Sequence, residues 1–477
     1  MEINKLKHVH FVGIKGVGMT ALAVYACEMG KTVTGSDVAE EFVTDEALKV
    51  LNITVFEEFN GSKYQKLAGK YKPDELLVVT TGAHQGFNNP EVKFAQGKRL
   101  EVVSHAEALG ILSRDKTVIA VAGTHGKTTT TAMIAHCLTK SGNDPSYLVG
   151  VGSIPTLPHP GHHGKSRLLI VEADEYVTDP QTDQTPRFHW LKPQILVLTS
   201  VEHDHPDVYP DLESVIEAFK KLVDKVPSDG TIIACIDNPG VEQVLKGNKA
   251  KIVWYGYSPR ADYRITNYSS NLSPNGRLTQ EFSVEHQGHE LFQADLSISG
   301  RHNAVNALAS IIASVEVGVP WTQAPSYLAG FNGTGRRFEL KNQLGKTILY
   351  DDYAHHPTEI KAVLAMAKEL YPEHHIVAIF QPHTYSRTKA LFYDFTRSFM
   401  DADEVYILDI FASAREKPDP SVSSRELAKE VDKHGIVAKY TPELEKLVEL
   451  VKSKLGKKQV IITMGAGDVY KLHSKLT

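Results

Sequence analysis

The residues best suited to chemistry lie in one loop that contains two glycines. The loop consists of Gly123, Thr124, His125, Gly126, Lys127, Thr128 and Thr129. The loop follows a β-rich run at 116–122 and opens a predicted helix, which is the setting that a phosphate-binding loop needs. Glycines let backbone N–H groups approach phosphate, and the Lys127 ammonium offsets charge on the β- and γ-phosphates. The usual spacing of such loops places a glycine at 121, where this chain has Val121. The motif predicts an ATP site.

Two acidic motifs follow predicted strands at 168–172 and 195–200. Glu172 opens the first motif, Glu-Ala-Asp-Glu, and His205 closes the second, Glu-His-Asp-His. Because ligand-binding residues gather at the carboxyl ends of strands in open α/β sheets, we expect both side chains to face the phosphate loop. With the Thr128 hydroxyl they would serve Mg²⁺. Imidazole is an unusual magnesium ligand, so a loop hydrogen bond from His205, or zinc binding without a cysteine partner, stays open.

The first strand, predicted at 8–12, is followed by a second glycine-rich loop: Gly13, Ile14, Lys15, Gly16, Val17 and Gly18. Its spacing is displaced from that of the dinucleotide-binding fingerprint, and Asp37 follows the next strand, about where a ribose-binding acid would lie. A nucleotide site and an ordinary tight turn both fit this pattern.

Four further groups of polar residues stand near predicted strand ends or helix starts. His302, Asn303 and Asn306 open an Ala-rich helix, and the two asparagines share one face of it. An asparagine can bind an adenine edge or cap a helix. The other groups contain Arg336, then Tyr353 and His355, then His383 and Arg387. Such side chains bind carboxylates and phosphates, although they can also be solvated loop residues.

These side chains require a scaffold, and short apolar runs alternating with helical patterns predict α/β units with mostly parallel sheets. Polar alternation between 250 and 300 predicts an antiparallel excursion. The formal charge of −5 disfavours a nucleic-acid partner, and three scattered cysteines favour a reducing compartment. The start of the chain lacks a long apolar stretch, and no run reaches 18 apolar residues. We therefore expect a cytoplasmic protein without membrane insertion.

Taken together, the motifs resemble those of the Mur ligases over nearly the whole chain. The resemblance rests on the phosphate loop, Glu-Ala-Asp-Glu, the Asp-His pair, Gly-Arg-His-Asn-x-x-Asn, Gly-Arg-Arg-Phe-Glu and Asp-Asp-Tyr-Ala-His-His-Pro-Thr-Glu. It implies a Rossmann-like UDP-sugar-binding domain at 1–114, a central P-loop ATPase α/β domain with the antiparallel excursion at 115–327, and a Rossmann-like amino-acid-binding domain at 328–477.

The resemblance also implies a reaction with ATP and Mg²⁺ as cofactors. The lactoyl carboxylate of UDP-N-acetylmuramate would be phosphorylated, and the amine of L-alanine would attack the acyl phosphate to form an amide, as in peptidoglycan precursor synthesis. The close alternative is a recycling ligase that adds a tripeptide to the same nucleotide sugar. Its C-terminal motif resembles Glu-Pro-Arg-Ser, whereas this chain has Gln-Pro-His-Thr-Tyr-Ser-Arg at 381–387. We expect a monomer or a weak homodimer.

The family's motifs assign a role to each matching residue. The phosphate loop, with Lys127, would hold ATP, and Thr128, Glu172 and His205 would serve magnesium. His302, Asn303 and Asn306 would lie at the adenine, and Arg336 would reach across from the C-terminal domain. The nucleotide sugar would bind at the Gly13–Gly18 loop and Asp37. The amino acid and the acyl phosphate would contact Tyr353, His355, His383 and Arg387.

Several positions depart from the family's pattern. Lys15, Ser200 and Thr384 replace residues found in many relatives, and 178–187 forms an unusual insert. Several Mur ligases use a carbamylated lysine, a role that we cannot assign to Lys220. A nicotinamide-dependent dehydrogenase would leave the phosphate loop without a task. A nucleotide-binding regulator would not need Glu172, His205 and the C-terminal cluster together.

Overall fold

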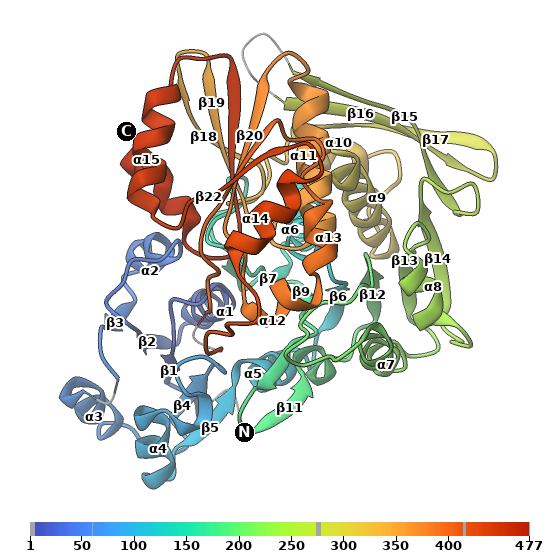
Figure 1. Ribbon diagram of the computed structural model, residues 1–477. Helices are drawn as coiled ribbons and strands as arrows, with labels where there is room; N and C mark the ends of the chain where they lie inside the picture. Colours follow the sequence, from blue (N-terminus) through green and yellow to red (C-terminus); the bar gives the residue numbers. More distant parts are fainter. Residues whose placement is uncertain (1–4, 60, 273–277, 414–415, 477) are drawn as a thin grey trace.

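The computed structural model describes residues 5–59, 61–272, 278–413 and 416–476. Along the chain it forms three α/β domains, each built around its own main sheet (Figure 1). The predicted three-domain α/β architecture is confirmed. None of the helices in the described ranges has the length and apolar character needed to span a bilayer.

The N-terminal domain is a parallel five-stranded sheet of order β3-β2-β1-β4-β5. Because β1 lies between β2 and β4, the strand order reverses beside it, and the loops after β1 and β4 flank one crevice. The strands are β1 (His8–Val12), β2 (Thr32–Ser36), β3 (Thr54–Phe56), β4 (Leu76–Thr80) and β5 (Glu101–Ser104). The helices are α1 (Val17–Glu28), α2 (Asp45–Val50), α3 (Ser62–Ala68), α4 (Pro90–Gly97) and α5 (His105–Leu112).

The central domain has a mixed ten-stranded sheet of order β17-β16-β15-β14-β13-β12-β6-β9-β7-β8. Its strands are β6 (Thr117–Ala122), β7 (Ser146–Leu148), β8 (Gly161–His162), β9 (Leu168–Ala173), β12 (Ile195–Leu198), β13 (Thr231–Cys235), β14 (Lys251–Gly256), β15 (Tyr263–Leu272), β16 (Leu278–His286) and β17 (His289–Leu296). The last three form the predicted antiparallel excursion. The helices are α6 (Lys127–Lys140), α7 (Leu212–Val223), α8 (Pro239–Leu245), α9 (Arg301–Glu316) and α10 (Ala324–Leu328).

Alternate residues of β6 enter two different cores, as the pleat of a buried strand requires. Ile119 and Val121 pack with residues of α6 and α9. Val118, Ala120 and Ala122 belong to a core that also contains α7 and the apolar residues of β1 and α1. The N-terminal and central domains therefore share one continuous core.

The C-terminal domain is a six-stranded sheet of order β18-β19-β23-β20-β21-β22, in which only β18 is antiparallel to its neighbour among the described pairs. The strands are β18 (Glu339–Leu344), β19 (Thr347–Asp352), β20 (His375–Phe380), β21 (Glu404–Ile407), β22 (Val437–Tyr440) and β23 (Gln459–Met464). The helices are α11 (Pro357–Leu370), α12 (Tyr385–Ala390), α13 (Phe392–Thr396), α14 (Ser424–Asp432) and α15 (Leu444–Lys454).

Two features differ from the sequence-based expectation. The predicted strand 195–200 ends at Leu198, because Thr199 and Ser200 turn to hydrogen-bond the phosphate loop. The insert after Glu-Ala-Asp-Glu forms a separate hairpin of β10 (Val177–Asp179) and β11 (Asp183–Pro186). The boundary expected at 114 lies in the turn before β6, and that at 327 lies within α10, which packs on α6, α9 and β17. Both boundaries stay predictions.

Candidate active site

The phosphate loop connects β6 to α6, and the chain after β12 fixes its shape. Ser200 accepts hydrogen bonds from the backbone N–H groups of Thr124 and His125, each at 2.9 Å. A side chain at Gly123 would collide with Thr199 and Ser200, and Gly126 has a φ of +80°. Glycine is therefore needed at both positions.

Strand order brings both acidic motifs to this loop. In the central sheet β6 lies between β12 and β9, parallel to each, with Ala122 paired to Leu198 and to Ala173. The three strands consequently end at the same edge. The loop, the motif that begins at Glu172 and the segment that ends at His205 meet there, as expected for an open α/β sheet.

The Lys127 ammonium forms a buried ion pair within this group. It lies 2.9 and 3.0 Å from the two carboxylate oxygens of Glu175, and it donates to the Gly123 carbonyl at 2.6 Å. Burial alone would lower the pKa of Lys127, but the Glu175 carboxylate raises it above its ordinary value. Lys127 therefore stays cationic at the start of α6, where a phosphate would bind.

Several oxygen atoms that could bind a metal ion lie near the Lys127 ammonium. The Thr128 hydroxyl donates to Glu172 Oε2 at 3.0 Å, and the Gly150 N–H donates to the other oxygen of Glu172. Burial raises the pKa of Glu172. His205 Nε2 lies 3.8 Å from Glu175 Oε1, and Asp174, Glu175 and His205 each offer a ligand atom within 4.8 Å of the others. This oxygen-rich set suits Mg²⁺, a hard cation.

Helix α9 covers the other side of the loop. A Cβ at Gly126 would lie 2.6 Å from Asn306 Oδ1, so Asn306 touches the loop backbone. Asn306 Nδ2 lies 3.4 Å from Asn303 Oδ1, and Asn303 donates to the Ser299 carbonyl at 2.7 Å. Burial lowers the pKa of His302 to about 4, which leaves its imidazole neutral at pH 7. The structure thus places Asn306 against the phosphate loop, Asn303 beside Asn306, and His302 at the start of the same helix.

Arg387 reaches this edge from the C-terminal domain. Its Nε donates to Asp204 Oδ1 at 2.7 Å, and its Nη1 donates to the His383 carbonyl at 3.1 Å. Asp204 directly precedes His205 and accepts a hydrogen bond from its backbone N–H at 2.7 Å. Burial would raise the pKa of Asp204, but the Arg387 guanidinium, together with the neighbouring histidines, holds it well below its usual range. The Asp204 carboxylate therefore contacts both His205, a proposed metal ligand, and Arg387, a residue of the proposed amino-acid site.

Tyr353 and His355 lie beside Arg387, in the turn between β19 and α11. The His355 ring is 6.1 Å from the His383 ring, and its Nδ1 lies 2.9 Å from the Tyr353 carbonyl oxygen. Burial lowers the pKa of His355 to about 3. The imidazole is therefore uncharged at pH 7, although it lies in a polar cluster.

The two consecutive arginines have different surroundings. Arg336 donates to Asp351 at 2.9 Å and to the Gly465 carbonyl at 2.7 Å, so its observed partners belong to the C-terminal domain. Arg337 lies 3.5 Å from Glu359 Oε1. Burial lowers the pKa of Arg337, but Glu359, Asp352 and, more weakly, Glu172 raise it above its ordinary value. Arg337 is thus the arginine whose charge acts on the central domain.

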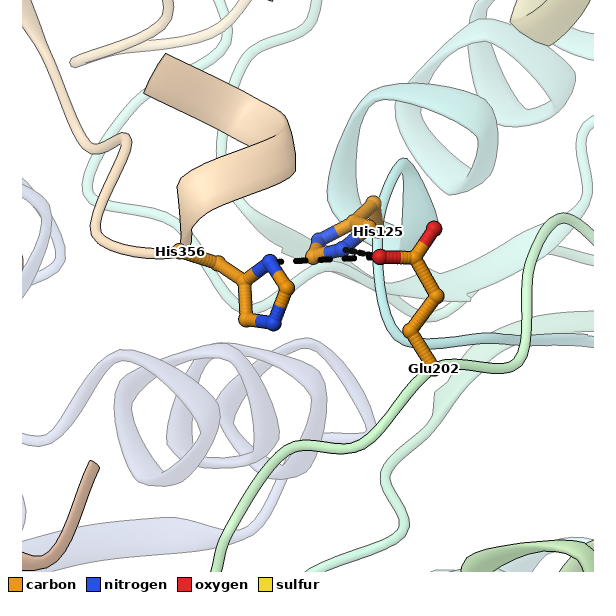
Figure 2. Close-up of side chains that lie close together, drawn as sticks. All are labelled: His125, Glu202 and His356. Carbon is orange, nitrogen blue, oxygen red and sulfur yellow. Dashed lines mark hydrogen bonds and ion pairs between the residues drawn. The ribbon is translucent and has the colours of Figure 1, made fainter. Parts of the chain in front are cut away.

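A charged cluster joins the phosphate loop to the start of α11. Figure 2 shows His125, Glu202 and His356 converging from three separate segments. His125 Nε2 lies 3.3 Å from Glu202 Oε2, its Nδ1 lies 3.3 Å from Glu359 Oε1, and Thr358 donates to Glu202 at 2.7 Å. Burial opposes protonation of His125, yet hydrogen bonds to the two carboxylates raise its pKa to about 9. His125 is therefore a cation between two domains at pH 7.

The N-terminal loop is a third element of the site. Asp37 is buried, and its carboxylate accepts hydrogen bonds from the backbone N–H groups of Lys15, at 2.7 Å, and Val38, at 2.8 Å. Lys15 Nζ donates to the carbonyls of Val38 and Glu40. Gly13 has a φ of +84°, Gly16 precedes α1, Gly18 packs against His105, and Val17 is exposed. In this structure Asp37 and Lys15 hold the loop in shape.

The structure brings most of the predicted central and C-terminal residues together at one edge, and the N-terminal loop lies at the crevice of its own sheet. Sequence reasoning did not select Glu175, Asp204, Arg337 or Glu359. Each stands within or beside a selected motif, and Glu359 lies in the first turn of α11, four residues after His355, which it approaches at 3.3 Å.

Comparison with known families agrees with this arrangement. Models described as Mur ligase family, catalytic domain, as Mur ligase middle domain and as Mur ligase, glutamate ligase domain match residues 8–117, 121–314 and 336–467. The chain is 38% identical over 472 residues to the UDP-N-acetylmuramate–L-alanine ligase of Desulfitobacterium hafniense, covering 98% of this chain and 99% of that protein. It is 36% identical to the enzyme of the same name from Caldanaerobacter subterraneus, covering 100% and 98%.

Solved structures give the same result. The UDP-N-acetylmuramate-alanine ligase MurC of Thermotoga maritima superimposes with a TM-score of 0.77 at 26% identity, with 98% of each chain covered. A murein peptide ligase from Psychrobacter arcticus superimposes with a TM-score of 0.69 at 25% identity, again with 98% of each chain covered. The chain therefore belongs to the Mur ligase family of ATP-dependent enzymes that form amide bonds.

Proposed function

We propose that this protein joins L-alanine to the lactoyl carboxylate of UDP-N-acetylmuramate with ATP, in cytoplasmic peptidoglycan precursor synthesis. The observation that carries the proposal is the contact between Asp204 and Arg387. This contact joins the edge that carries the phosphate loop to Arg387 of the C-terminal domain, which supports a phosphoryl-transfer site beside an amino-acid site. A ligase that activates a carboxylate and then delivers an amino acid needs both at one place.

The central domain would carry out the activation. A free carboxylate is a poor electrophile toward an amine, so it is first converted to an acyl phosphate. Lys127 and the loop N–H groups would hold the phosphates, with Asn303 and Asn306 at the adenine and Arg337 approaching from the C-terminal domain. We propose that Thr128, Glu172 and His205 hold Mg²⁺, whose chemistry is to offset charge on the transferring phosphoryl group.

The C-terminal domain would bind the amino acid. Arg387 can hold the α-carboxylate of L-alanine through a two-pronged contact. His355 is neutral at pH 7 and adds no positive charge that would repel the amine. The rings of Tyr353 and His383 lie 5.1 and 6.1 Å from the His355 ring, and both would restrict the pocket to a small side chain.

A tripeptide recycling ligase is the alternative, because a murein peptide ligase has the same fold. The presence of His383 and Arg387, which suit a single amino acid, and the names of the relatives that match the whole chain support L-alanine. We propose a monomer or a weak homodimer.

Phosphate release from ATP tests the proposal when substrates are omitted one at a time. We expect release to require magnesium, UDP-N-acetylmuramate and L-alanine together. Release that continues without the nucleotide sugar, or without any amino acid, would contradict a ligase of this kind.

A further inference from the structure

The β10–β11 hairpin lies outside the ten-stranded sheet and contacts the N-terminal domain (Figure 1). The contact is centred on Asp179, whose side chain is only 1% exposed. Asp179 Oδ1 accepts hydrogen bonds from the N–H groups of Gln181 and Thr182, which rigidifies the hairpin tip. The remaining oxygen, Oδ2, accepts the Phe87 N–H of the N-terminal domain at 3.2 Å.

The receiving loop, residues 81–88, fits closely around this carboxylate. A side chain at Gly86 would collide with Asp179, and a Cβ at Gly82 would lie 2.8 Å from Pro180. Asn88 also donates to Gln181 at 3.0 Å. The contact is thus a fitted junction between two domains.

The same loop has an unusual backbone. His84, Gln85 and Gly86 have φ values of +51°, +71° and +51°, so three consecutive residues are left-handed. Such conformations are unfavourable for residues with a Cβ and persist only where the surroundings hold them. Because Asp179 binds the N–H group that immediately follows, the hairpin is the external support of this conformation.

The supported loop follows β4, next to the loop after β1, where the strand order of the N-terminal sheet reverses. The His84 ring packs on Phe59 at 5.0 Å, and its Nε2 lies 3.4 Å from Asp37 Oδ1. A Cβ at Gly13 would lie 3.4 Å from the same ring. Ligands of open α/β sheets bind in this crevice. His84 is 25% exposed there and can donate to a phosphate or carbonyl oxygen.

We propose that Asp179 is a positioning residue for the nucleotide sugar. The hairpin of the central domain holds loop 81–88, and through it His84, at the crevice of the N-terminal domain. The identity of the ligand rests on the proposed function. The base of the hairpin is tied at the other end by Arg187, which pairs at 2.7 Å with Asp174 of the Glu-Ala-Asp-Glu motif. The hairpin therefore links the nucleotide-sugar crevice to the phosphate-transfer edge.

The test compares full-length Asp179→Ala and Asp179→Asn with Asp183→Ala, a change in the same hairpin. Asp183 accepts a hydrogen bond from the Thr185 N–H. It is a suitable control because this hydrogen bond lies within the hairpin. Calorimetric titration with UDP-N-acetylmuramate and steady-state kinetics give the readouts. For Asp179→Ala we expect Kd and KM for the nucleotide sugar to rise about tenfold, the lower end of the effect of a hydrogen bond to a charged group. The kcat value and the KM values for ATP and L-alanine should change less than about twofold.

Asp179→Asn should restore part of the affinity, because its amide oxygen can still accept the Phe87 N–H, and Asp183→Ala should match the wild type. Unchanged Kd and KM in Asp179→Ala would overturn the positioning role, as would a loss of kcat and thermal stability with an unaltered KM. A wild-type protein that binds no UDP-N-acetylmuramate would overturn the proposed function and the ligand named here. If the wild type and all variants bind UDP-N-acetylmuramate equally well, only the inference about Asp179 is overturned.

Discussion

At the scale of single residues, the main charges of this site are paired with one another. Lys127 pairs with Glu175, Arg387 with Asp204, and His125 with Glu202. The sequence identifies Lys127 and Arg387 from their motifs and spacing. It does not identify their partners, since pairing depends on which strand ends lie together. Each of these charged side chains therefore belongs to an ion pair in the folded protein. Replacing one should affect both the activity and the free energy of unfolding.

Lys127→Met should abolish ligation, because no other group in the loop can place an ammonium against the phosphates. It should also lower stability by about 3 kcal/mol or more, since breaking a buried pair leaves Glu175 without a counter-ion. The double variant Lys127→Met/Glu175→Gln should recover most of that stability and none of the activity. Thermal melting without nucleotide and phosphate release measure the two effects. A single variant with wild-type turnover would remove this loop from the mechanism.

Arg387→Ala should raise the KM for L-alanine by about 10- to 150-fold, as expected for the loss of a charge-assisted hydrogen bond of roughly 1.5–3 kcal/mol. Arg387→Lys should restore only part, because an ammonium cannot form the two-pronged contact. The KM values for ATP and the nucleotide sugar should change much less. Lys389→Ala on the same helix is the control, as Lys389 is exposed and pairs with Asp419. Alanine saturation that is unchanged in Arg387→Ala would contradict this assignment.

At the scale of elements, the sequence predicts those strands and helices whose apolar residues form a regular pattern along the chain. The buried strands near 119, 170 and 197, the antiparallel excursion and the Ala-rich helix follow from apolar periodicity, and the structure contains all of them. The hairpin at 177–186 was not predicted, because its strands are short and polar and part of its contacts are to another domain. The approach of Glu359 to His125 was also not predictable, since it depends on how α11 docks on the phosphate loop.

That docking should depend on pH through His125. The pKa of His125 is raised in the folded protein from 6.5 to about 9, so its stabilising contribution is complete below about pH 6.5 and is lost as the pH rises through about 9. Wild type should therefore melt higher than His125→Gln at pH 7, and the difference should shrink toward zero by about pH 10. His434→Gln, at an exposed position, serves as the control. A difference between wild type and His125→Gln that does not change with pH would contradict the ion pairing.

At the scale of the whole molecule, the two interfaces of the central domain differ in chemistry. Its contact with the N-terminal domain includes a shared apolar core together with the hairpin junction at Asp179. Its contact with the C-terminal domain contains the ion pairs of Arg387 and His125, with Leu272 and Leu278 packed against the C-terminal core. The proposed amino-acid site is therefore joined to the proposed phosphate-transfer site mainly by charged groups, which would suit a domain that admits L-alanine and releases a product.

We propose that the three domains act together to join L-alanine to UDP-N-acetylmuramate. The most direct measurement supplies ATP, magnesium and UDP-N-acetylmuramate with equal concentrations of L-alanine and the recycling tripeptide, and identifies the nucleotide product by mass spectrometry. We expect UDP-N-acetylmuramoyl-L-alanine as the main product, formed with one phosphate for each amide. A product that carries only the tripeptide, from an enzyme inert with L-alanine alone, would contradict this proposal.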